Sequence, residues 1–235
     1  MTTHPAAFIL ASLLTAYPAE DFLEQVSLMY QELSEDSEVS PETRNLAQNI
    51  HEQLLPFYQM PELLDNLRSV YIDLFDRSGR LNSLYETEYG KQRAIYKGNE
   101  LIDIAGFYKA FGMEMGQEGA ISEMVDHLSV ELEFYAILLI KNQALEEKQD
   151  QEGILTLLDA RCKFLKEHLG PFVKGLSKRP EIVEDLFFSE VFNFTSHLVD
   201  LELNCLNITL PEEKDLFLEN VPQENEELSC GNSIL

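Results

Sequence analysis

The sequence has few basic residues, since 17 Lys and Arg stand against 42 Asp and Glu, which gives a formal net charge of −25. Such a charge repels the phosphates of DNA and RNA and the anionic face of a membrane, so nucleic-acid binding is not expected. The same charge attracts a cationic partner, for example an arginine-bearing peptide, and speeds its encounter. A simpler reading is that the acidity only keeps the protein soluble.

Cysteine is also scarce, and the sequence lacks long apolar runs. Cys162, Cys205 and Cys230 are odd in number and far apart without a CxxC spacing, so neither a disulfide framework nor a zinc site is predicted, and a reducing compartment fits best. No stretch reaches 18 uninterrupted apolar residues, and the apolar run near the N-terminus has no basic residue before it. We therefore expect a cytoplasmic protein without stable membrane insertion.

The common signatures of catalysis are missing as well. None of the five histidines has a glutamate three positions before it, which the di-iron carboxylate bundles require. HExxH, a Walker loop, GxGxxG and GxSxG are absent too, so the usual motifs of zinc proteases, nucleotide sites and esterases are excluded. We predict a protein that is not an enzyme, with no catalytic residues, no metal and no cofactor.

Apolar residues recur at helical spacing along most of the chain, as they do at Phe8, Leu10 and Leu14. Pro18 interrupts the pattern, and Ser40 followed by a proline is typical of a helix start. Sustained strand alternation is lacking, so the predicted fold class is all-α. After two N-terminal helices, the expected helices run over 41–57, 61–76, 100–111, 122–144, 153–169 and 180–207, with a loop and a short helix over 81–99.

The pattern predicts one helical domain over residues 1–210, built as a compact bundle in two layers or lobes. Glycines at 112, 116 and 119 indicate a hinge over residues 113–121, which would join lobes of about 1–112 and 122–210. From residue 211 to residue 235 the chain has seven acids, one lysine and few apolar residues. Such a composition is typical of a loose acidic tail.

Asp126 and His127 stand where one of the predicted helices begins. On a helical wheel His127, Glu131 and Phe134 lie along one strip, so an imidazole and a carboxylate one turn apart border the apolar face. The pair is either a structural lock or an acidic recess that accepts guanidinium groups through bidentate carboxylate geometry. A metal site there would need a third ligand, and the sequence does not identify one.

Two further segments combine aromatic and polar residues. The segment YETEYG, from Tyr85 to Gly90, places tyrosines beside carboxylates, which suits a peptide-binding surface and equally suits a loop packed over the core. The run DIAGFYKAFG, from Asp103 to Gly112, holds Gly106 inside a predicted helix. Glycine there costs about 1 kcal/mol relative to alanine, so the run indicates a close approach of two helices.

Taken in order, these segments resemble the TorD/DmsD/NarJ family of redox-enzyme (molybdoenzyme) maturation chaperones. The matching pieces are Tyr71-x-x-Leu74-Phe75, YETEYG, DIAGFYKAFG, Asp126-His127-Leu128 with the following ELEF, and LDARCKFLKEHLGPF. The family usually has proline before the Asp-His pair, where this chain has Val125, which leaves the shape of the loop into the long helix open.

The resemblance implies a cytoplasmic, all-helical chaperone that binds the twin-arginine signal peptide and the apo catalytic subunit of a molybdopterin oxidoreductase. It would assist insertion of the molybdenum cofactor and hold back export until the subunit is folded, as in Tat export proofreading. Asp126, Glu131 and Glu88 would supply carboxylates for the arginines. The full set of expected peptide- and client-binding residues is Tyr71, Tyr85, Glu88, Tyr89, Asp103, Tyr108, Asp126, His127, Glu131 and Phe134.

Other readings stay open at this point. The chain would be a monomer or a domain-swapped homodimer, because a glycine-containing hinge permits an exchange of lobes. An alternative function is a helical protein-interaction adaptor for a non-redox partner. Another is a metal- or nucleotide-binding helical protein that uses His127 and Glu131.

Overall fold

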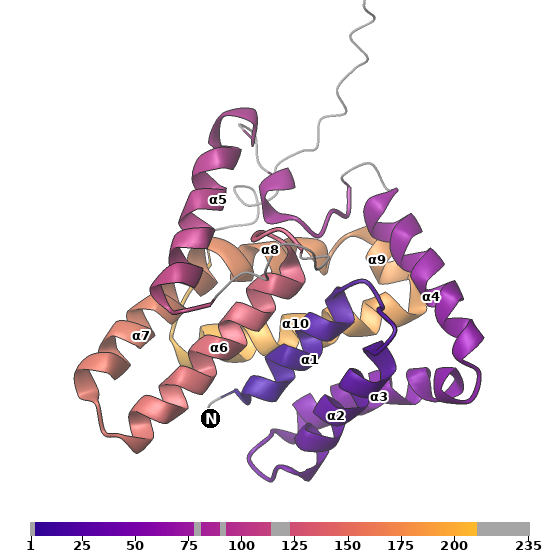
Figure 1. The fold of residues 1–235 in the computed structure, drawn as a ribbon, viewed down its shortest axis with the longest axis horizontal. Coiled ribbons are helices and arrows are strands. Elements are labelled where there is room, and N and C mark those ends of the chain that lie inside the picture. Colours follow the sequence, from indigo (N-terminus) through magenta and orange to yellow (C-terminus); the bar gives the residue numbers. More distant parts are fainter. Residues whose placement is uncertain (1–2, 78–80, 90–92, 114–122, 211–235) are drawn as a thin grey trace, which may run out of the picture.

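A computed structural model describes residues 3–77, 81–89, 93–113 and 123–210 (Figure 1). Helices account for most of these residues and no strand occurs among them, so the predicted all-α class is confirmed. No helix in this part of the chain is both long and apolar enough to cross a membrane. The predicted acidic tail and all of the predicted hinge except Met113 lie outside the described residues.

The N-terminal helices begin and end at the predicted breaks. They are α1 (Pro5–Thr15), α2 (Phe22–Glu35) and α3 (Pro41–Gln59). The N-cap of α3 is Ser40, whose Oγ accepts a hydrogen bond from the Thr43 amide at 3.0 Å. Helix α1 is apolar around most of its circumference, which is typical of a helix buried on all sides. It therefore lies at the centre of the bundle.

The middle of the chain differs from the prediction at one helix start. A 3₁₀ turn (Pro61–Leu63) leads into α4 (Leu64–Tyr71), which continues as a π turn (Ile72–Asp76). The short helix expected over 81–99 is a 3₁₀ turn (Glu86–Glu88), but α5 (Arg93–Ala110) begins seven residues before the expected residue 100. The residues missed read RAIYKGN, in which charged residues and a glycine interrupt the apolar ones, so helical periodicity did not detect them.

The C-terminal half contains three departures from the predicted helices. Helix α6 (Leu128–Glu147) begins six residues after the expected start at 122. Helix α7 (Gln151–Phe164) continues as a π turn (Leu165–Leu169) and then as α8 (Gly170–Leu176), which was not predicted. The single helix expected over 180–207 is wrong, because the chain forms α9 (Pro180–Glu184) and α10 (Leu186–Cys205) instead.

Helices from both predicted lobes share one hydrophobic core. Figure 1 shows α1 running alongside α6 and in front of α10, and contacts join α1 to α2, α6 and α10. Helix α3 packs on α10 and α2, whereas α7 packs on α6. The core cluster includes Phe8 of α1, Leu54 of α3, Phe134 of α6 and Phe192 of α10. The division into lobes stays a prediction, while the core itself spans both.

Candidate functional site

Backbone hydrogen bonds join the segment 83–89 to the start of α6. The Glu86 amide donates to the Asp126 carbonyl at 2.9 Å, and the Leu128 amide donates to the Leu84 carbonyl at 2.8 Å. Tyr85 and His127 are thereby paired as an isolated antiparallel bridge. The fold therefore brings together the YETEYG and Asp-His motifs, which are about 40 residues apart in the sequence.

The buried Asp126 side chain connects the start of α6 to the segment 83–89. Its Oδ2 accepts hydrogen bonds from the Thr87 Oγ1 at 2.5 Å and the Thr87 amide at 3.3 Å. A hydrogen bond to a charged acceptor contributes more than a neutral one, roughly 1.5–3 kcal/mol. Asp126 thus stabilises the turn that presents the neighbouring side chains.

His127 is the N-cap of α6 and is buried. Its Nδ1 accepts a hydrogen bond from the Ser129 amide at 3.2 Å and lies 2.7 Å from the Ser129 Oγ. Its ring meets the Tyr85 ring edge-on, with the centroids 4.9 Å apart. Burial lowers the pKa of His127 to about 4, against the opposite influence of Glu123 and Asp126. The imidazole is therefore neutral at neutral pH.

Glu131 is fully buried and is not hydrogen-bonded to His127, as a structural lock between the two would require. Among the described residues, neither of its carboxyl oxygens has a hydrogen-bond partner. Burial, reinforced by the carboxyls of Glu86 and Asp126, raises the pKa of Glu131 well above its usual range. Glu86 approaches Glu131 without reaching hydrogen-bond geometry. Glu131 is consequently a neutral acid beneath the surface.

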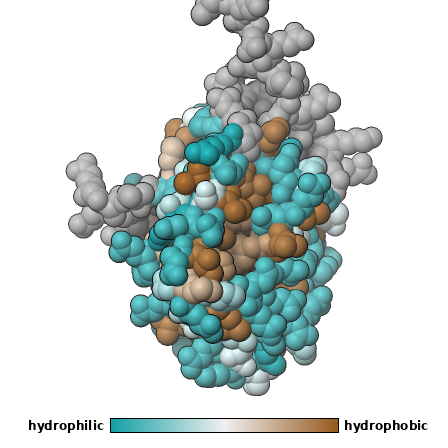
Figure 2. Space-filling model, turned by 90° about the vertical axis from the view of Figure 1, so that its right-hand side faces the viewer, coloured by the Kyte–Doolittle hydropathy of each residue, from teal (hydrophilic) through white to brown (hydrophobic). Residues whose placement is uncertain are grey.

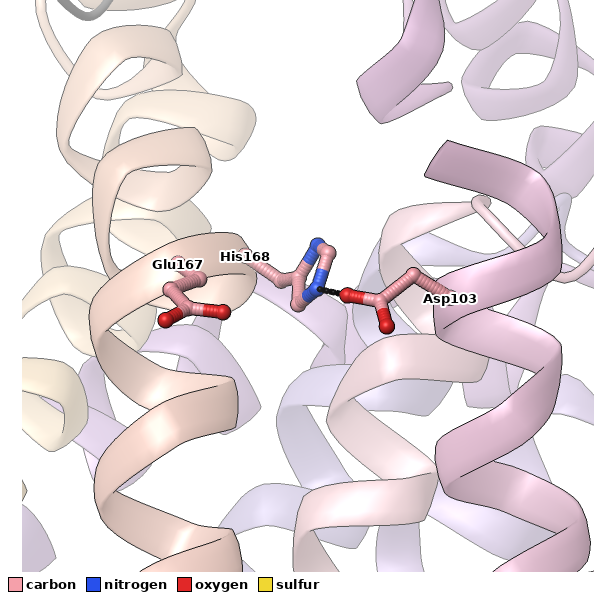
Figure 3. A group of neighbouring side chains, drawn as sticks. All are labelled: Asp103, Glu167 and His168. Carbon is pink, nitrogen blue, oxygen red and sulfur yellow. Dashed lines mark hydrogen bonds and ion pairs between the residues drawn. The ribbon is translucent and has the colours of Figure 1, made fainter. Parts of the chain in front are cut away.

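His168 lies between two acids that come from other parts of the chain. Its Nδ1 is 3.1 Å from Glu86 Oε2, and its Nε2 is 3.3 Å from Asp103 Oδ2, the contact drawn in Figure 3. Burial disfavours the imidazolium, but the hydrogen bonds and charges of Glu86 and Asp103 outweigh that effect and raise the pKa of His168. This triad joins the segment 83–89, α5 and the π turn that follows α7.

Aromatic side chains form the floor below these acids. Tyr108 and Phe134 are fully buried, with ring centroids 4.6 Å apart, and the Tyr108 hydroxyl donates to the Val125 carbonyl at 2.7 Å. Phe164 packs on Phe134, and Phe107 meets the His168 ring edge-on. Tyr108 and Phe134 are therefore core residues that support the acids and do not themselves reach the surface.

The remaining predicted residues surround the segment 83–89. The half-buried Tyr85 donates its hydroxyl to Glu123 Oε2 at 2.7 Å, and Glu88 accepts from the Lys97 ammonium at 2.6 Å. Tyr89 is buried and donates to the Ser83 carbonyl at 2.7 Å.

Tyr71 lies at the edge of the same region and is buried. Its hydroxyl donates to the Thr15 carbonyl at 3.3 Å, and its ring meets the rings of Tyr17 and Phe75 edge-on. Burial, with Glu123 among the contributing acids, raises the pKa of Tyr71. The predicted residues thus gather in one region, but mostly below its surface.

The residues that a partner could touch are mainly ones that were not predicted. Glu86 is half-buried, Glu123 is partly exposed and Glu100 is exposed, whereas Asp103 is the most exposed member of the predicted set. His168 was missed because it stands 82 residues from Glu86 in the sequence. The only sequence signal for His168 was its place within LDARCKFLKEHLGPF.

The one group of metal-ligand side chains that lie close together among the described residues is Asp103, Glu167 and His168 (Figure 3).

Comparison with known protein families matches residues 36–177 to the family described as nitrate reductase delta subunit. The match covers more than half of the chain and includes every site residue from Tyr71 to His168. Members of that family are molybdoenzyme maturation chaperones and not catalysts, so the resemblance to the TorD/DmsD/NarJ chaperones is confirmed. The chain therefore belongs to the nitrate reductase delta subunit family of chaperones, whose partners are subunits of molybdoenzymes.

Proposed function

We propose that this protein acts in the cytoplasm on the apo catalytic subunit of a molybdopterin oxidoreductase. It binds the twin-arginine signal peptide of that subunit, assists insertion of the molybdenum cofactor and holds back export until the subunit has folded. Family membership supports the molybdoenzyme partner. The observation that carries the peptide-binding part is the group of accessible acids, Glu86, Asp103 and Glu123, held around the segment 83–89.

The chemistry of this group suits arginine. A guanidinium presents a planar set of donors that two carboxylates accept in bidentate fashion, and it stays charged at any physiological pH. His168 contacts both Glu86 and Asp103, and the Tyr85 hydroxyl donates to Glu123. In this proposal Asp126 and His127 act indirectly, because Asp126 accepts from Thr87 and His127 is paired with Tyr85, which fixes the backbone from which Tyr85 and Glu86 project. Glu131 lies buried below them.

Apolar surface for the rest of a signal peptide lies on a neighbouring face. Figure 2 shows the side of the molecule that carries α4 and α9, where apolar residues gather between hydrophilic ones. Val70 of α4 and Val183 of α9 are exposed, and Leu186 at the start of α10 is 84% exposed. Tyr71, the last residue of α4, is near enough to Glu123 for that carboxyl to help raise the pKa of the tyrosine. In this proposal the basic part of the leader binds the acids and the apolar part that follows binds the exposed apolar residues of α4, α9 and α10.

The first test is a titration of the purified protein with a labelled synthetic twin-arginine leader, beside a copy in which both arginines are alanine. We expect micromolar or tighter binding that weakens when the arginines are lost. Binding should also weaken as salt rises, because exposed charges are screened beyond a Debye length of about 8 Å at physiological ionic strength. Equal binding of the two peptides, or no binding of any leader in a panel, would contradict the proposal.

A second test locates the site on the protein. The pair Glu86→Gln and Asp103→Asn should weaken leader binding and flatten its salt dependence, because two accessible charges are removed. The control pair, Glu152→Gln and Asp159→Asn, removes the same charge from exposed positions on α7. The pair Asp126→Asn and Glu131→Gln tests the buried acids and should also weaken binding. If the α7 pair weakened leader binding as much as the site pair, binding would depend on the net charge of the protein and not on the proposed site.

Copurification separates the proposal from a general adaptor. A tagged copy of the protein, expressed where the molybdenum cofactor cannot be made, should bring down one large apo catalytic subunit. Recovery of partners with no relation to molybdoenzymes would favour the adaptor instead.

A further inference from the structure

Three side chains with metal-binding groups meet where α5 faces the π turn after α7. Asp103 belongs to α5, and Glu167 and His168 are consecutive residues of the π turn Leu165–Leu169. One ligand atom from each lies within 4.8 Å of the other two. Figure 3 shows the His168 ring between the two carboxylates, with Asp103 reaching it from the opposite helix. Three ligands from two elements are enough to hold an ion with one position left for water.

The His168 imidazole is oriented as metal-binding histidines usually are. Its Nδ1 is engaged by the Glu86 carboxylate, which leaves Nε2 directed at Asp103. A carboxylate on the second ring nitrogen fixes the orientation of the ligand and raises its basicity. The ring is 6% exposed and packs against Phe107 and Phe164, so it cannot turn away.

The spacing of two of the three ligand atoms is close to the spacing that a bound ion imposes. His168 Nε2 and Asp103 Oδ2 are 3.3 Å apart, which is long for a charged hydrogen bond. Two ligand atoms that each lie about 2.1 Å from a tetrahedral ion are roughly 3.4 Å from one another. The pair can therefore accept an ion with little movement of either side chain.

The charges around the group also favour a cation. Besides the two carboxylates of the group, the Glu86 carboxylate lies 3.1 Å from the Nδ1 of His168. Lys163 Nζ lies 3.9 Å from Glu167, but both side chains are about half exposed, and such an ion pair contributes little.

We propose that Asp103, Glu167 and His168 bind a divalent transition-metal ion of the Zn²⁺ class. One imidazole and two carboxylates suit such ions better than Mg²⁺ or Ca²⁺, which prefer oxygen ligands alone. A bound ion joins α5 to the π turn and so fixes the position of Asp103 and, through His168, of Glu86. The proposed metal site shares Asp103 with the proposed leader site, but metal binding is tested without any peptide.

The test is calorimetric titration of the chelator-treated full-length protein with Zn²⁺ at neutral pH. We expect one ion per chain, with weaker binding when Asp103→Asn or Glu167→Gln removes a ligand. Glu86→Gln, which removes only the partner of Nδ1, should weaken binding by roughly 10- to 100-fold. The exposed acids Glu152 and Asp159 of α7 provide matched controls, and their amide variants should bind as the unmodified protein does.

Spectroscopy with Co²⁺ distinguishes this site from a cysteine site. The bound ion should show the weak visible bands of nitrogen and oxygen ligands without a thiolate charge-transfer band. Circular dichroism should show that the variants at the exposed Asp103 and Glu167 remain folded, so that weaker Zn²⁺ binding by them reports the loss of a ligand. The proposal is overturned if Zn²⁺ does not bind stoichiometrically, or if Asp103→Asn and Glu167→Gln bind it unchanged.

Discussion

At this site, the pKa of each ionisable side chain depends on how deeply it is buried and on which charges lie beside it. His127 and Glu131 stand one helical turn apart, and both are held neutral because burial disfavours their charged forms. His168 is almost as buried, yet Glu86 and Asp103 shift the balance the other way. Glu86 and Asp103 keep contact with water, so a partner can reach them. The buried residues His127 and Glu131 therefore support the site from within, whereas Glu86 and Asp103 are the ones that a partner can contact.

The buried His127 should make the protein less stable in acid. Its pKa is about 4 when folded against 6.5 when unfolded, so between these values the unfolded chain binds more protons and stability falls as pH falls. The Glu123 and Asp126 carboxyls, which face this imidazole, oppose the lowering of its pKa, and the Tyr85 ring meets it edge-on. The total effect is roughly 3 kcal/mol of unfolding free energy once the pH is well below 4.

Urea unfolding of the His127→Asn variant checks this expectation. Asparagine is a good N-cap and does not titrate, so the variant should lose less stability than the unmodified protein between about pH 7.5 and about pH 4.5. The difference between the two proteins, and not either slope alone, isolates the imidazole from the many carboxyls that titrate in the same range. Parallel curves would show that His127 is not the group responsible.

At the scale of elements, polar caps decide where the helices begin. Ser40 caps α3, His127 caps α6, and Asp185 caps α10 by accepting at Oδ1 from the amides of Phe187 and Phe188. The cap at Ser40 was predicted because a proline follows it. The cap at Asp185 was not, because apolar spacing continues across residues 180–207 and only the side-chain hydrogen bonds reveal the break.

Removal of the Asp185 cap should destabilise the protein modestly. The Asp185→Ala variant leaves two amides of the first turn of α10 without their acceptor, and caps of this kind contribute roughly 0.5–2 kcal/mol. Chemical unfolding measures the loss. Asp159→Ala, at an exposed position inside α7, is the matched control and should be neutral or slightly stabilising, since alanine is the better helix former. Equal losses in the two variants would rule out a capping role.

At the scale of the whole molecule, a buried ion pair ties three helices of the core together. Glu202 Oε2 of α10 accepts from the Tyr135 hydroxyl of α6 at 2.6 Å and from Arg161 Nη2 of α7 at 2.5 Å. Glu202 is fully buried and Arg161 nearly so. All three helices belong to the second predicted lobe, and α1 and α3 of the first lobe pack on α10.

Removal of one member of this network should cost far more than removal of the pair. Glu202→Ala leaves the Arg161 guanidinium buried without its counter-ion, which costs roughly 3–5 kcal/mol. The double variant Arg161→Met with Glu202→Leu replaces the charges by apolar volume and should recover most of that loss. Thermal unfolding measures the stability of the two variants. Equal destabilisation would show that the loss comes from altered packing and not from an unpaired buried charge.

The sequence by itself determined the helical class, most helix breaks and the chaperone family of this protein. Those features depend on residues that are neighbours within a helical turn, or on motifs read in order, so no knowledge of the fold is needed. Only the tertiary structure decided that His127 is a cap without a bond to Glu131, and that Tyr108 and Phe134 are core residues. It also brought His168 to Glu86 and Asp103, because burial and long-range hydrogen bonds depend on how distant segments pack, and local spacing carries no record of that.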